Sequence, residues 1–95
     1  MELIRVFGMS LTRDEFLRQL AAAMENESIA EEGNTFRHEE PGRGWRITLQ
    51  PLPPNVLGAI TLERQRVEIQ FTGYSAQEAG TFLDRFAMHF RRGRG

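Results

Sequence analysis

Apolar and polar residues follow two different periods along this chain. In residues 12–24 the apolar positions recur every three to four residues, which is typical of an amphipathic helix with one buried face. A second stretch with this period covers residues 75–93. Between them, in residues 34–72, the period falls to two, which favours strands with one buried and one solvated face. The pattern therefore predicts two helices flanking a β segment.

Both predicted helices begin with a capping box, in which a hydroxyl and a glutamate three residues later satisfy free backbone N–H groups. Thr12 and Glu15 form the first box, and Ser75 and Glu78 form the second. The second helix also carries Gly80 in its interior, where glycine costs about 1 kcal/mol relative to alanine. We attribute Gly80 either to close approach of the helix to its neighbours or to space for a ligand beneath it.

Five strands are predicted from the apolar runs and the turn residues around them. The first is closed by Gly8, and the predicted ranges are 2–7, 35–39, 44–50, 57–62 and 66–72. Residues 40–43 and 63–65 are expected to form the turns of two hairpins. The prolines in residues 51–54 are expected to end the third strand, since proline cannot donate to a strand ladder. Residues 25–34, which carry four glutamates, are expected to form a loop.

These elements predict a single α+β domain over residues 1–95 with the order β-α-β-β-β-β-α. Its antiparallel five-stranded sheet would hold both helices on one face, and residues 91–95 would form a flexible tail of arginine and glycine. This order resembles the arrangement shared by the TATA-binding-protein-like (TBP-like) and helix-grip folds. Members of those folds bind DNA, lipids or hydrophobic ligands, or serve as co-chaperone domains, so the resemblance implies a fold without selecting a function.

The composition of the chain excludes several kinds of binding and catalytic site. The net charge is −1, so the chain as a whole has no bulk attraction to nucleic acid or anionic lipid. It has no cysteine, which excludes disulfides and thiolate metal sites, and all 12 basic residues are arginine, which excludes Schiff-base chemistry on lysine. No apolar stretch is long enough for a membrane span, so we expect a soluble, cytoplasmic protein with no membrane partner.

The residues that could carry catalysis or bind a metal are few. His38 lies beside Glu39 and Glu40, but adjacent residues of a strand face opposite ways. His38 can therefore easily share a metal or acid–base site with only one of the two glutamates. His89 is at helical spacing from Arg85, and this cationic setting opposes metal binding. The best-placed hydroxyls are helix caps. We therefore expect no enzyme, with no catalytic residue, no metal and no cofactor.

What remains for function is the sheet face opposite the helices. The leading hypothesis is a non-catalytic binding or accessory domain that acts by protein–protein contact, with a homodimer as one form of that contact. The alternatives are nucleic-acid binding, through the arginines of this face and a basic tail at Arg91, Arg92 and Arg94, and binding of a small hydrophobic ligand beneath the second helix. The candidate interaction face comprises Leu3, Arg5, Phe7, Arg37, Arg46, Thr48, Glu68 and Gln70.

Overall fold

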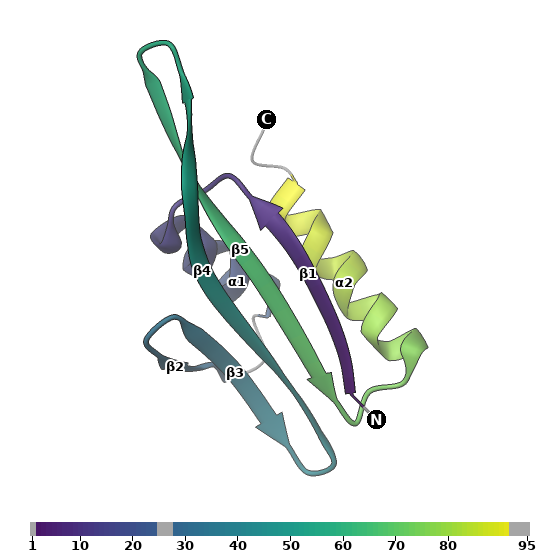
Figure 1. Cartoon of the computed structure of the whole chain (residues 1–95). Helices are drawn as coiled ribbons and strands as arrows, with labels where there is room; N and C mark the ends of the chain where they lie inside the picture. The colour runs from purple at the N-terminus through teal and green to yellow at the C-terminus, as the bar shows by residue number, and fades with distance from the viewer. Residues whose placement is uncertain (1, 25–27, 92–95) are drawn as a thin grey trace.

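A computed structural model describes residues 2–24 and 28–91, without the side chains of Glu2 and Arg91. It has an α+β fold in which a five-stranded antiparallel sheet is combined with two helices (Figure 1). The elements are β1 (Glu2–Met9), α1 (Arg13–Ala23), β2 (Ala30–Glu32), β3 (Thr35–Glu40), β4 (Arg43–Leu57), β5 (Ile60–Thr72) and α2 (Ala76–Arg91).

Both helices begin where the capping boxes predict. The Thr12 hydroxyl accepts from the Glu15 amide at 3.1 Å, and the Glu15 carboxylate accepts from the Thr12 amide at 2.8 Å. Ser75 and Glu78 repeat this exchange at 3.1 and 2.9 Å. Four backbone N–H groups at each helix start lack helical partners, and each box supplies two of them with oxygen acceptors.

The core lies between the helices and one face of the sheet. The Phe16 ring of α1 meets those of Phe86 and Phe90 of α2, with centroids 6.1 and 5.0 Å apart. The sheet contributes the alternating residues that the pattern assigned to the core, and all of them are buried: Trp45, Ile47, Leu49, Val67, Ile69 and Phe71. Both helices therefore cover the same face.

The strands lie in the order β1-β5-β4-β3-β2, so β1 and β2 are the two edges. The predicted turn between β3 and β4 is present, with Gly42 at a φ of 87°. The predicted loop before β3 is wrong in one part, because Ala30–Glu32 pairs with Thr35–Arg37 as a short edge strand. Gly33, with a φ of 62°, provides the left-handed turn for this hairpin.

The second predicted hairpin is wrong in its position. The prolines of residues 51–54 do not end the strand, and no turn forms at residues 63–65. β4 continues to Leu57, the chain turns at Gly58 and Ala59, and β5 runs back without interruption from Ile60. A bulge between Leu52 and Asn55 takes up the register shift in this long pair.

Pro53 and Pro54 lie within the bulge, and Pro51 is tolerated because its nitrogen faces an open edge. The Leu49 amide donates to the Asn34 carbonyl, 2.9 Å away, on the side of β4 that faces β3. N–H groups two residues apart point the same way, so the nitrogen of Pro51 points to that side too. The pairing of β3 with β4 stops at Thr35 and Thr48, so no described strand needs a donor there.

Candidate interaction surface

The strand register divides the sheet into two faces. Residues that pair directly across antiparallel strands lie on the same face. Ile4, Gln70, Arg46 and Arg37 therefore form one row across β1, β5, β4 and β3, on the face opposite the helices. We call this the outer face. Of the predicted interaction residues, it holds Arg37, Arg46, Thr48, Glu68 and Gln70.

The structure corrects the placement of the predicted residues on β1. Leu3 pairs with Phe71 and Phe7 pairs with Val67, so both lie on the helix side, packed against the core. The Phe7 ring stacks on Phe86 with centroids 6.0 Å apart. Apolar residues occur on both faces of this strand, so the sequence alone does not show which face is buried. In the structure α2 packs on the face that carries Phe7. The outer face instead receives Ile4 and Val6, each about half exposed at 49% and 48%.

Arg5 also faces the helix side rather than the outer face, because it pairs with the buried Ile69. It is exposed at the sheet edge and donates to the carbonyl of Ile4 at 3.0 Å. A charged side chain that points inward on an edge strand is a common obstacle to edge-to-edge pairing. Arg5 therefore protects this edge.

The end of the β4–β5 hairpin, residues 52–64, extends past the other described strands, and we call it the arm. It projects beyond β1 and the helices at the top of Figure 1. Its large apolar side chains face solvent, with exposed fractions of 64% for Val56, 62% for Leu57, 59% for Ile60 and 41% for Leu62. A two-stranded hairpin is at best marginally stable by itself in water, so this segment is a candidate for contact with another surface.

The apolar residues of the arm and of β1 share one face. By register, Leu62 lies opposite Asn55 and Ile60 opposite Leu57, in phase with the outer-face residues of β5. We call the set Ile4, Val6, Leu57, Ile60 and Leu62 the outer strip. Gly8 lies between its two parts, where a Cβ would lie 3.6 Å from the Arg64 guanidinium and 4.0 Å from Leu52, so an arginine and an apolar side chain separate them. Five of the seven exposed large apolar residues in the described part of the chain thus fall on the outer face.

The charges of the outer face largely neutralise one another. Arg37 pairs with Glu32 at 3.0 Å, and Arg66 pairs with Glu68 at 3.0 Å. Arg46 has no ion pair among the described residues, and Glu39 likewise has none. Positive and negative side chains therefore alternate on this face, and neither sign dominates it.

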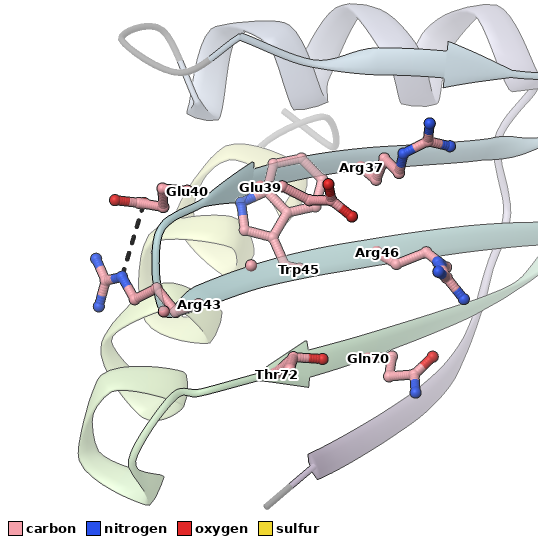
Figure 2. Close-up of a pocket in the computed structure, with 10 residues that line it drawn as sticks. Arg37, Glu39, Glu40, Arg43, Trp45, Arg46, Gln70 and Thr72 are labelled. Carbon is pink, nitrogen blue, oxygen red and sulfur yellow. Dashed lines mark ion pairs between the residues drawn. The ribbon is translucent and has the colours of Figure 1, made fainter.

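A shallow, open depression of about 510 Å³ lies on the outer face near the β3–β4 turn. Figure 2 shows the side chains of Arg37, Arg46 and Gln70 along its side, each from a different strand. The glycine at position 44 allows β3 to come close, because a Cβ there would lie 2.7 Å from the carbonyl oxygen of His38. The depression holds both acids and arginines, which is a polar surface without a single preferred ligand charge.

The side chain of His38, the histidine beside the glutamates of β3, contacts neighbouring protein groups. His38 Nδ1 lies 2.8 Å from the Ser28 carbonyl and its Nε2 lies 3.4 Å from Glu40. Among the described residues, no three histidine or carboxylate side chains are grouped to hold a metal ion. The pKa of Glu78 is lowered, chiefly by the hydrogen bond from the Ser75 amide and further by the charge of Arg43.

The predicted basic tail lies outside the part that the structure describes: Arg92 and Arg94 are beyond it, as is the side chain of Arg91. One signal in the sequence could have pointed to the arm. Every residue from 47 to 62 is uncharged, in a chain with 26% charged residues. A solvated connection would normally carry charges, so this run sets the segment apart from an ordinary surface loop.

Two further observations bear on the class of protein. Within residues 2–24 and 28–91, neither helix is both long and apolar enough to cross a membrane. Comparison of the sequence with protein-family models found no matching family, and comparison with curated proteins found no match.

Proposed function

We propose that this chain is a non-catalytic protein-interaction domain that self-associates through the outer strip. The observation that carries the proposal is the shared face of the exposed apolar residues of β1 and of the arm. Scattered surface apolar residues are ordinary, whereas several exposed apolar residues gathered on one face are typical of an interface.

Charge supports a second copy of the chain as the partner. The outer face alternates arginines with glutamates, and the net charge of the chain is only −1. A face with both signs can match its own copy under a two-fold rotation, while a partner of one strong charge would meet repulsion from half of these groups. Low net charge also leaves little general repulsion between copies.

Nucleic-acid binding has less support. Two arginines of the outer face are neutralised by glutamates 3.0 Å away, and no aromatic ring lies on the described outer face to stack with a base. Binding of a hydrophobic ligand under α2 has less support too. Phe82 and Phe86 there are almost fully buried and contact other aromatic rings, so they occupy the space that a ligand would need.

We also propose that the fold is of the TBP-like or helix-grip kind. The order of one strand, a helix, four strands and a second helix supports this assignment. The fold by itself does not choose the partner.

The mass of the protein in solution tests the self-association. Analytical ultracentrifugation between about 10 and 500 µM should give the mass of a dimer, and the double variant Val6→Asp with Leu57→Asp should give a monomer. Both positions are exposed, so the fold should tolerate the change, and circular dichroism checks this. Met88→Asp is the matched control, because Met88 is 66% exposed on α2 and should leave the dimer intact. A wild-type monomer at every concentration, or a dimer that the double variant does not weaken, would overturn the proposal.

A further inference from the structure

Arg66 divides the outer face into two halves of equal length along β5. The outer-facing residues of this strand occur at every second position from Ile60 to Thr72, and Arg66 lies midway between these ends. Ile60 is at the tip of the arm, and Thr72 lines the depression (Figure 2). A second copy can pack on this face antiparallel, with the two-fold axis crossing the strands at Arg66. Residues equally far from Arg66 on its two sides then lie opposite each other.

The residues on either side of Arg66 carry opposite charges. The Arg64 guanidinium lies on the outer face, 3.6 Å from the point where a Cβ of Gly8 would be. It contacts the Pro53 carbonyl at 3.5 Å and has no ion pair within the described part of the chain. The Glu68 carboxylate pairs with Arg66 and is still 34% exposed, so it can accept from a second donor. In the antiparallel arrangement, Arg64 faces the partner's Glu68, once on each side of the axis.

The same arrangement covers the outer strip. Leu62 and Gln70 are equally far from the axis, and Gln70 pairs with Ile4 of β1. Leu62 therefore lies against the partner's Gln70 and beside the partner's Ile4. The aliphatic stem of the partner's Arg64 covers Val6 in the same way, because Val6 pairs with the residue that faces it. Apolar side chains of the arm thus cover those of β1, and the reverse.

The tip of the arm reaches the depression of the second copy. Leu57 pairs with Ile60 at the tip, and Gly44 pairs with Thr72 across the depression. Since Ile60 and Thr72 are equally far from the axis, the tip lies over the partner's depression, where Gly44 has no side chain to obstruct it. A hairpin that is marginally stable in water thereby gains a surface to pack against.

Resting on the proposed self-association, we propose that two copies pack their outer faces antiparallel about an axis at Arg66, each arm lying over the sheet of the other. Charge and strand length select this register. With the axis one residue nearer the arm, Arg64 would face the partner's Arg66. With the axis one residue the other way, Ile60 would lie beyond Thr72, where β5 ends. The two Arg66 side chains meet at the axis, and each is paired with its own Glu68 at 3.0 Å.

Reversing the charges at positions 64 and 68 tests the contact between copies. Arg64→Glu and Glu68→Arg should each weaken the homodimer at least about tenfold, because like charges then face each other twice. In an equimolar mixture the two variants should bind each other at least about tenfold more tightly than either binds itself, since opposite charges meet again in the mixed dimer. Arg18→Glu, exposed on α1, is the matched control and should leave the dissociation constant unchanged. Sedimentation velocity measures all of these, and circular dichroism checks the fold.

Cross-linking tests the direction of the arms. The chain has no cysteine, so introduced ones react alone. A mixture of Ile60→Cys and Thr72→Cys should be joined by a short bis-maleimide. Ile60→Cys by itself should not, because each arm tip faces the partner's Thr72 and the two tips are about 40 Å apart, the length of β5 between these residues.

The outcomes separate this inference from the proposed function. A wild-type dimer that dissociates in the Val6→Asp and Leu57→Asp variant, but whose charge variants fail to bind each other or whose Ile60→Cys copies cross-link to themselves, would overturn the antiparallel arrangement and leave self-association in place. A wild-type monomer throughout would overturn both. Mutual binding of the charge variants together with the cross-link between positions 60 and 72 supports both.

Discussion

The guanidinium of Arg43, at the start of β4, lies 3.0 Å from the carboxylate of Glu78 in the first turn of α2. The same guanidinium lies over the Tyr74 ring, 4.6 Å from its centroid. Glu78 also forms the capping box with Ser75. A single carboxylate therefore caps α2 and pairs with Arg43, which follows the β3–β4 turn. This contact links two segments that are far apart in the sequence.

Glu78→Gln should lower the free energy of unfolding at neutral pH and make that free energy less dependent on pH in the acid range. The pKa of Glu78 is lowered from 4.5 in the folded state, so the folded protein favours the charged carboxylate. Its contribution is therefore present above pH 4.5 and is lost as the pH falls through the lower folded value. Urea unfolding at pH 7 and at pH 3 measures this. The difference between wild type and variant should be larger at pH 7, and an equal difference at both values would contradict the role assigned to the charge.

Gly73→Ala should destabilise the protein more than Gly58→Ala. Both glycines have a positive φ, 76° at Gly73 and 61° at Gly58, where a side chain costs about 1–2 kcal/mol. At Gly73 the added Cβ would also run into the carbonyl oxygen of Gly42, whereas nothing lies within 4 Å at Gly58. We expect a loss of about 2–5 kcal/mol for Gly73→Ala, from backbone strain and overpacking together. Chemical denaturation checks this, and equal losses would show that the contact with Gly42 does not matter.

Gly80→Ala should stabilise the protein. An added Cβ at Gly80 meets no atom within 4 Å, so the expected close approach of the helix to its neighbours is absent. The gain should be about 1 kcal/mol, the difference in helix propensity between the two residues. Thermal unfolding should then show a melting temperature higher by about 4–8 °C. Ala87→Gly, at an exposed position of the same helix, should give the opposite shift. A lower melting temperature for Gly80→Ala would indicate that this position needs glycine.

Phe7→Ala should cost far more stability than Val6→Ala. Phe7 packs against the core and stacks on Phe86, whereas Val6 lies on the outer face and is 48% exposed. Removing a core phenylalanine side chain typically costs about 3–5 kcal/mol, and the partial burial of Phe7 places it near the lower end. An exposed strand valine should cost about 1 kcal/mol or less. Urea unfolding of both variants at the same low protein concentration measures the two losses. A larger loss for Val6→Ala than for Phe7→Ala would contradict the assignment of Phe7 to the core side of β1.

Much of the fold could be predicted from local signals. The capping boxes at Thr12 and Ser75 fix the helix starts, because the groups that bond lie within three residues of each other. The strict alternation around Ile47 and Ile69 likewise identifies the buried face of the sheet, since a strand with one covered face must place its apolar residues every second position.

The sequence by itself thus determined the two helices, the β-rich segment between them and the core residues of β4 and β5, because these depend on short-range bonds and on period. Only the tertiary structure decided the rest. The face of β1 depends on which side α2 covers, and so Phe7 became core and Val6 became surface. Pro51 continues a strand because β3 ends before it and leaves that side of β4 open, and a bulge takes up Pro53 and Pro54. The arm follows from that absence of a neighbouring strand, which the uncharged run of residues 47–62 accompanies but does not by itself specify.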